Sequence, residues 1–226
     1  RRSRVLEKLR AGKLASSVKL NLADPRVAEI AAACGVDCIW IDMEHVPNDL
    51  RDVENQIRAA KTYDVDTVVR VPRGSYSDLV RPLEMDATGI MVPHLMSAAD
   101  ARKVVWQTRF HPVGRRPIDG GNADGAYCTI PAYDYTQQAN RERFVIVQIE
   151  DPEPMAELDE IVRVEAWRSG GPAAVADDWR AYFAREPQAE VDVLVGEDRV
   201  ELVVRVCNSQ GGTPVVREVF RQMVHV

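Results

Sequence analysis

The sequence predicts a single α/β domain built on a parallel β-sheet, and three observations support this fold class. Short apolar runs alternate with longer amphipathic segments through most of the chain, which is typical of repeated βα units. Hydrophobic residues make up 46% and charged residues 28% of the 226 residues, so one core can be buried. Because α/β barrels commonly reach about 250 residues, we expect residues 1–226 to form one domain.

Strands are expected where a short apolar run is bounded by turn residues or by the start of a helix. Pro72 ends one of these runs, because proline cannot donate a hydrogen bond to a neighbouring strand. The expected strands are VKLNL (18–22), VDCIWID (36–42), DTVVRVP (66–72), GIMVP (89–93) and RFVIVQIED (143–151).

Helices are expected between these strands, and several carry recognisable start signals. Asp24 can cap a helix that begins with Pro25, and Ser97 can cap another. Pro82 should either kink its helix or lie in the first turn. The expected helices cover residues 26–35, 49–63, 76–85, 97–109 and 155–165.

Two segments interrupt the βα rhythm. Residues 111–134 are rich in Gly and Asp and are long for a connection, so we expect a functional loop that covers a site. After residue 165 the pattern is weaker, with a helix expected at 177–185 and a strand at 191–195. Residues 200–206, VELVVRV, alternate as a half-exposed antiparallel edge strand does, so residues 166–226 are expected to be atypical.

Composition narrows the class of partner. The formal net charge of −6 argues against nucleic-acid binding, which needs a basic face, and favours small-molecule chemistry. No run approaches the ~20 apolar residues of a membrane span, and no apolar signal core follows the first residues, so we expect no membrane association and a cytoplasmic location. The four cysteines include no C-x-x-C pair and are expected to be reduced.

Polar side chains gather where three expected strands end. They are Asp42, Glu44 and His45 after one strand, Arg70 within the next, and Gln148 and Glu150 in a later one. Active sites of parallel α/β sheets lie at the carboxyl ends of the strands, which meet at one edge. We therefore expect these side chains to converge on one mouth.

Each of these residues also has a purely structural interpretation. Arg70 lies among valines, so its charge must be paired or must bind an anion, and a salt bridge with Glu44 is the structural alternative. Asp42 could cap a turn, and His45 could lie on a surface loop. His94 follows a strand without a neighbouring acid and is expected in a loop or in a supporting position.

Five motifs together resemble those of the HpcH/HpaI aldolase family, the 4-hydroxy-2-oxoheptanedioate aldolases, over about residues 12–165. The motifs are GVDCIWIDMEH (35–45), VVRVP (68–72), MDATGIMVPH (85–94), HPVGRR (111–116) and VQIE (147–150). The resemblance implies a (β/α)8 TIM barrel and a homo-oligomer, usually a hexamer. It also implies a class II aldolase that uses Mg²⁺, Mn²⁺ or Co²⁺ and acts on a 2-keto acid and an aldehyde.

The resemblance also implies roles for the residues at the strand ends. His45 would be the base acting through water, Asp42 would orient it, and Arg70 would hold the keto-acid oxygen. Glu150 would be a metal ligand and Gln148 would lie beside the substrate. Cleavage of a 4-hydroxy-2-keto acid leaves a pyruvate enolate, whose charge a metal and an arginine can offset. A Schiff-base aldolase would need a lysine at a strand end, and none is expected there: Lys19 is read as an early-strand residue.

The family pattern changes after residue 165. The family places a second metal ligand, an Asp, in a G-P-x-D segment, whereas this chain has Gly171, Pro172 and then Ala174. Asp177 is the substitute we favour, with Asp178 or Asp198 as alternatives. Barrel closure is therefore left open, and two functions remain: a metal-dependent aldolase, or a non-catalytic barrel that binds a keto acid or anion without a complete metal site.

Overall fold

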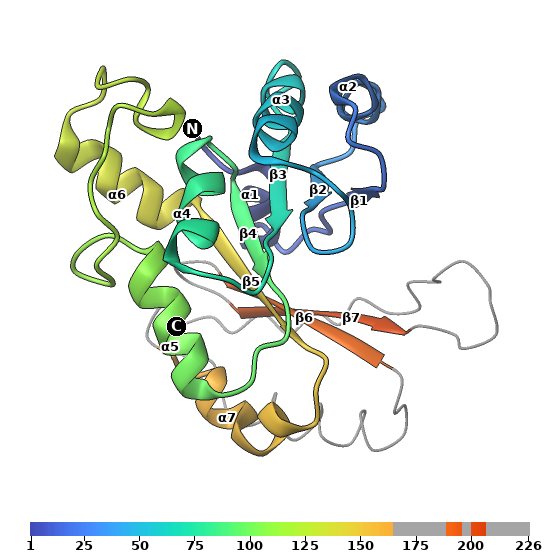
Figure 1. Ribbon diagram of the computed structural model, residues 1–226, viewed down its shortest axis with the longest axis vertical. Coiled ribbons are helices and arrows are strands. Elements are labelled where there is room, and N and C mark those ends of the chain that lie inside the picture. Colours follow the sequence, from blue (N-terminus) through green and yellow to red (C-terminus); the bar gives the residue numbers. More distant parts are fainter. Residues whose placement is uncertain (165–188, 196–199, 207–226) are drawn as a thin grey trace.

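The computed structural model describes residues 1–164 and the backbone of residues 189–195 and 200–206, and it has the expected α/β architecture (Figure 1). Seven strands form one sheet in chain order, β1 to β7. Strands β1 to β5 are parallel, whereas β6 pairs antiparallel with β5 and β7 pairs antiparallel with β6. The strands are β1 (Ser17–Leu20), β2 (Cys38–Asp42), β3 (Asp66–Arg70), β4 (Gly89–Val92), β5 (Phe144–Ile149), β6 (Ala189–Val195) and β7 (Val200–Val206).

The first five strands are the βα units that the sequence predicts, and the later strands depart from that pattern. The expectation of an antiparallel edge strand at 200–206 is confirmed, because β7 lies at one end of the sheet. Only residues 196–199 separate β6 from β7, which suits an antiparallel pair, because a parallel pair needs a long crossover. Within the described residues β1 and β7 are the two sheet edges, so ring closure is not seen there. The helix expected at 177–185 lies outside the described residues.

Helices connect the strands and pack against the sheet (Figure 1). Two of them, α1 and α6, were not expected, and the helix expected at 155–165 is reduced to a 3-10 turn and one α-helical turn. Pro82 lies inside α4, near its end. No helix in the described part of the chain is long and apolar enough to cross a bilayer. The helices are α1 (Arg4–Arg10), α2 (Pro25–Ala33), α3 (Leu50–Lys61), α4 (Tyr76–Glu84), α5 (Ala98–Thr108), α6 (Ala132–Glu142) and α7 (Leu158–Ile161), with 3-10 helices η1 (Ala123–Gly125) and η2 (Glu153–Glu157).

Alternation along the strands separates two buried apolar clusters. One contains Ile39, Ile41 and Val69 of the sheet together with buried residues of α2, α3, α4, α5 and α7. The other contains Cys38, Trp40, Val68, Met91, Phe144 and Ile146, together with Val5, Leu6 and Leu9 of α1. We call the sheet face of this second cluster the inner face. Because side chains repeat every second residue, Asp42, Arg70 and Gln148 lie on the inner face, one step beyond its apolar residues.

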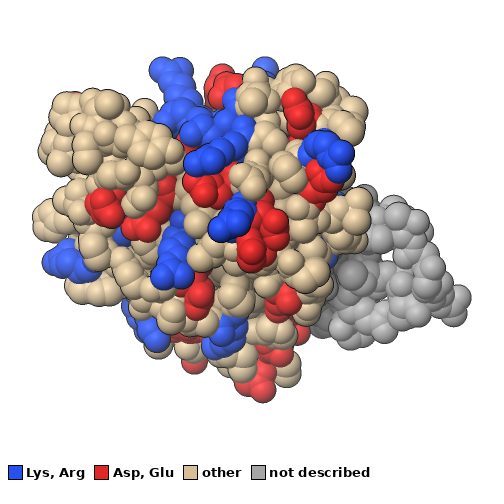
Figure 2. All heavy atoms as spheres, turned by 45° about the horizontal axis from the view of Figure 1, so that its top comes forward, with Lys and Arg blue, Asp and Glu red and all other residues tan. Residues whose placement is uncertain are grey.

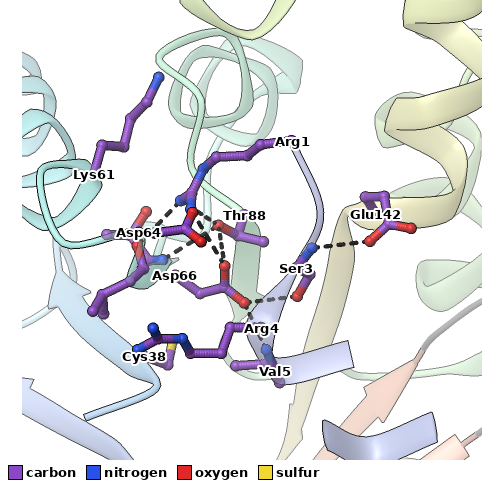
Figure 3. A network of polar contacts seen from close by, with 12 residues as sticks. Arg1, Ser3, Arg4, Val5, Cys38, Lys61, Asp64, Asp66, Thr88 and Glu142 are labelled. Carbon is purple, nitrogen blue, oxygen red and sulfur yellow. Dashed lines mark hydrogen bonds and ion pairs between the residues drawn. The ribbon is translucent and has the colours of Figure 1, made fainter. Parts of the chain in front are cut away.

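Residues at the amino ends of the strands tie α1 to the sheet (Figure 3). The buried carboxylate of Asp66, the first residue of β3, accepts hydrogen bonds from Ser3 Oγ at 2.7 Å, the Val5 backbone N–H at 2.8 Å and Thr88 Oγ1 at 3.2 Å. Burial raises the pKa of Asp66 despite these donors.

On the face shown in Figure 2, basic and acidic side chains are interspersed rather than gathered by sign.

Residues 111–134, the long stretch after α5, lie at the amino ends of the strands. The predicted site lies at the carboxyl ends, so the expectation that this stretch covers it is wrong. The Arg109 side chain, just after α5, donates a 2.7 Å hydrogen bond to the carbonyl of Arg143, which immediately precedes β5. Further along, a buried ion pair joins Arg116 to Asp124 at 2.6 Å, and the Tyr135 hydroxyl donates to Asp124 at 2.7 Å. These buried contacts give the stretch a structural role away from the carboxyl ends of the strands.

Gly89 leaves room for a ring in the inner cluster. A Cβ atom at this position would lie 2.3 Å from Phe144 Cε2, and Phe144 is buried with 1% exposure. We expect Gly89→Ala to lower the free energy of unfolding by about 1–3 kcal/mol, because the ring has no free space to enter. Urea denaturation measures this change. The double variant with Phe144→Leu should regain part of the loss, and additive losses would contradict the steric explanation.

Candidate active site

The residues predicted for the site lie together at the carboxyl ends of the strands. Asp42 and Arg70 are the last residues of β2 and β3, and they are direct neighbours in the parallel register. Gln148 lies next to the end of β5, and Glu150 follows that strand. The expected convergence of these side chains on one edge is therefore supported by the strand register and by the contacts below.

Arg70 is paired on both sides of its guanidinium. Its Nε donates to Asp42 Oδ1 at 3.0 Å and its Nη2 to Asp42 Oδ2 at 2.6 Å, which makes a two-point contact. Its Nη1 lies 3.0 Å from Glu44 Oε2, so the salt bridge considered as the structural alternative is present. The guanidinium also lies over the Trp40 ring, 5.1 Å from its centroid. Arg70 is thus held in one orientation, with its side chain only 8% exposed.

Asp42 is the buried centre of this network. Besides Arg70, its carboxylate contacts Lys19 Nζ at 2.9 Å and accepts the backbone N–H groups of Glu44 and His45 at 2.9 and 3.3 Å. Burial by itself would raise the pKa of Asp42, but the hydrogen bonds from Arg70 and Lys19 outweigh it and hold that pKa well below its ordinary range. Asp42 is therefore a fixed anion that positions two cations.

Lys19 corrects the expectation that no lysine lies at the site. It is the third of the four residues of β1, and its Nζ contacts the same Asp42 oxygen as Arg70 Nη2. It also lies over Trp40, 5.5 Å from the ring centroid. An ammonium held in an ion pair has no lone pair for attack on a carbonyl, so this contact favours an electrostatic role over a Schiff base.

The ion pairs of Asp42 predict how stability depends on pH. Because its pKa is lower in the folded than in the unfolded chain, the unfolded chain binds more protons as the pH falls below about 4. The contribution of Asp42 is therefore complete at neutral pH and is lost in acid. We expect the difference in unfolding free energy between the wild type and Asp42→Asn to shrink from pH 7 to pH 3, measured by denaturation at each pH. A difference that stays constant would contradict this assignment.

His45 is exposed and lies beside Glu44. Its side chain is 67% exposed, and its Nε2 lies 3.5 Å from Glu44 Oε2. Asp42 contacts His45 through the backbone N–H and not through the ring. The structure therefore does not show the expected contact of Asp42 with the imidazole; Asp42 instead fixes the turn that carries His45.

Glu44, His94 and Glu150 form a cluster of possible metal ligands. One ligand atom from each lies within 4.8 Å of the others. His94 has a left-handed backbone with φ of 50°, and its N–H donates to Glu150 Oε1 at 2.8 Å. Its Nδ1 lies 2.8 Å from Asp151 Oδ2, and this hydrogen bond raises the pKa of His94. Sequence reasoning named Glu150 as a ligand but placed Glu44 beside Arg70 and His94 in a supporting position.

The donor atoms of this cluster, which we call the Glu44–His94–Glu150 cluster, fit a divalent cation. Two carboxylates and an imidazole suit Mn²⁺ or Co²⁺, and oxygen ligands also suit Mg²⁺. The buried Glu44 Oε2 makes no hydrogen bond, although Arg70 Nη1 is near it. The carboxylates at this mouth outnumber the Lys19 and Arg70 cations, so a divalent cation would balance their charge. The carboxylates are those of Asp42, Glu44, Glu150 and Asp151.

Two further residues predicted for the site are Gln148 and Asp177. Gln148 is buried on the inner face, and its Oε1 has no hydrogen-bond partner among the described residues. Asp177, together with the alternatives Asp178 and Asp198, lies outside the described residues. Whether one of them joins Glu150 stays a prediction.

Comparisons with known proteins show which family this chain resembles. The family described as HpcH/HpaI aldolase/citrate lyase matches residues 17–210. The hydroxypyruvate/pyruvate aldolase of Pseudomonas aeruginosa is 34% identical over 163 residues, which cover 72% of this chain and 60% of that protein. The 2-keto-3-deoxy-L-rhamnonate aldolase of Escherichia coli is 34% identical over 159 residues, covering 70% and 59%.

A solved structure agrees with these relatives. A family protein from Burkholderia cenocepacia superimposes with a TM-score of 0.66 at 33% identity, over 73% of this chain and 66% of that one. The chain spans about 60% of the length of the two aldolases above.

Proposed function

Because this chain belongs to the HpcH/HpaI aldolase/citrate lyase family, we propose that it is a divalent-metal-dependent aldolase. It would cleave or form 4-hydroxy-2-keto acids through a pyruvate enolate. The observation that carries this proposal is the placement of a fixed arginine beside the Glu44–His94–Glu150 cluster at one edge of the sheet. Two relatives are named for aldolase activity on hydroxypyruvate/pyruvate and on 2-keto-3-deoxy-L-rhamnonate, which supports a keto acid and an aldehyde as substrates.

The keto-acid half of the substrate is bound by groups on the inner face. Arg70 presents a cation whose position is set by Asp42 and Trp40, so the guanidinium itself need not turn to hold a keto-acid oxygen. The amide of Gln148 can donate to the same molecule, because an amide carries two N–H groups. Lys19 offsets the charge of Asp42 and so leaves more of the Arg70 charge for the substrate.

The metal would be held by Glu44, His94 and Glu150, with Asp177 proposed as a further ligand. When bound, a divalent ion such as Mg²⁺, Mn²⁺ or Co²⁺ acts as a Lewis acid that offsets the charge of an enolate. His94 can donate a lone pair only in its neutral form, so a proton on His94 and a cation in the cluster exclude each other.

His45 is the residue that we propose to accept the proton of the substrate hydroxyl. Its imidazole is exposed at the mouth beside Glu44, where a water molecule can connect it to a hydroxyl group. An imidazole changes charge near neutral pH and so can take the proton as the carbon–carbon bond breaks and return it in synthesis. Homo-oligomer formation, as a hexamer, stays a prediction that rests on the family, and a cytoplasmic location stays a prediction that rests on the sequence.

Pyruvate release tests this function. The protein is stripped with a chelator, reloaded with Mn²⁺ or Co²⁺, and given 4-hydroxy-2-keto acids while lactate dehydrogenase reports pyruvate. We expect cleavage that depends on the added ion and on His45. Binding of oxamate, a stable keto-acid analogue, without cleavage of any such substrate would instead support the non-catalytic alternative.

A further inference from the structure

Carboxylates contact all three nitrogens of the Arg70 guanidinium in the described part of the structure. Asp42 occupies its Nε and Nη2, and Glu44 lies 3.0 Å from its Nη1. An incoming keto acid must therefore displace one of these carboxylates or compete with it. Which carboxylate can move determines how the anion gains access to the guanidinium.

Asp42 is the carboxylate that stays. It is completely buried and also holds Lys19 and two backbone N–H groups, so moving it would break several contacts at once. Glu44 has a side chain that is 13% exposed, and its Oε2 makes no hydrogen bond. Glu44 is therefore the carboxylate whose displacement costs less.

Glu44 also belongs to the metal-ligand cluster. Its Oε1 lies 3.6 Å from His94 Nε2, while its Oε2 lies near Arg70, so the residue bridges the two halves of the site. A cation in the Glu44–His94–Glu150 cluster attracts this carboxylate and weakens its hold on Arg70 Nη1. The same cation reduces the negative charge that opposes an anionic substrate.

Building on the proposed function, we propose that Glu44 couples the two binding events: it shields Arg70 until a divalent cation binds, so the cation binds first and the keto acid second. Glu44 is then a positioning residue that acts through Arg70. Its removal has two opposite effects. Cation affinity falls, because a ligand is lost, while the affinity of the metal-free protein for a keto-acid anion rises.

Isothermal titration calorimetry with Mn²⁺ and oxamate tests this coupling. The comparison uses the wild type, Glu44→Gln and Glu150→Gln, which remove one charge each from the same cluster. Of these two glutamates, only Glu44 lies within ion-pair distance of Arg70 among the described residues. We expect metal-free Glu44→Gln to bind oxamate about tenfold more tightly than the wild type, the effect of about 1.4 kcal/mol, and Glu150→Gln less than about twofold. Both variants should bind Mn²⁺ more weakly.

The outcomes separate this inference from the proposed function. Equal gains in both variants would show a general charge effect and would overturn the role of Glu44, as would no gain in Glu44→Gln. If the wild type binds no Mn²⁺ but Glu44→Gln still gains oxamate affinity, the metal function fails while the shielding of Arg70 stands. Thermal unfolding confirms that each variant is folded, and Glu44→Ala provides a second variant that should show the same gain.

Discussion

Glu150→Gln is expected to lower the affinity for Mn²⁺ by at least about 10- to 100-fold, the range seen for the loss of weaker, outer contacts of a metal site. The amide keeps the size of the side chain but replaces an anionic ligand by a neutral one. Glu150 belongs to the Glu44–His94–Glu150 cluster and also accepts the His94 N–H, so the variant affects two features of the site. Metal-dependent cleavage should fall by about 10²- to 10³-fold, the cost of losing one group that stabilises the developing anion.

Calorimetry and pyruvate release measure these two effects of Glu150→Gln. The matched control is Glu153→Gln, an exposed acid three residues further along that lies outside the cluster. The control should leave both the Mn²⁺ affinity and the cleavage rate close to those of the wild type. Equal losses in the two variants would mean that the overall charge of this end, and not ligation by Glu150, supports the activity.

Arg70→Met is expected to affect both stability and catalysis. Removal of the guanidinium leaves the buried Asp42 carboxylate with Lys19 as its remaining cationic contact, and breaking a buried pair in this way costs about 3–5 kcal/mol of unfolding free energy. Loss of the cation that faces the substrate should lower kcat/KM by about 10²- to 10³-fold. Urea denaturation and the pyruvate assay report the two effects.

A control and a double variant separate these effects of Arg70. Arg73→Met removes a 45%-exposed arginine that pairs with Asp100, and it should change stability by no more than about 1 kcal/mol. The double variant Asp42→Asn/Arg70→Met should recover part of the stability lost in Arg70→Met, because no buried carboxylate then lacks its partner. It should not recover activity. A stable but inactive Arg70→Met would contradict only the structural part of the role.

The sequence predicts much of this fold because the βα units are marked locally. Apolar runs ended by polar residues located the five parallel strands, and Asp24 and Ser97 cap helices as expected. Alternation predicted the antiparallel β7. By contrast, α6 was not expected, because its sequence is mostly polar and only four of its residues are buried, two of them Thr136 and Asn140.

The site was only partly predictable, for a geometric reason. Asp42, Arg70 and Glu150 were chosen because each follows or ends an apolar run, and that rule needs only the strand order. The contact of Lys19 with Asp42 depends on the register between β1 and β2, which the sequence does not state. Likewise, His94 has a left-handed backbone and donates its N–H to Glu150, and no local sequence motif predicts this conformation.

The proposed function requires that residues at the carboxyl ends of the strands, together with a divalent cation, convert pyruvate to its enolate. Deuterium exchange into pyruvate tests this requirement most directly. The measurement needs no knowledge of the aldehyde. Protein with Mn²⁺ is incubated with pyruvate in D₂O, and mass spectrometry follows incorporation into the methyl group. We predict exchange well above that caused by Mn²⁺ alone, and its loss in Arg70→Met and Glu150→Gln. Exchange no faster than with the free ion, in a protein that calorimetry shows to bind Mn²⁺, would contradict the account.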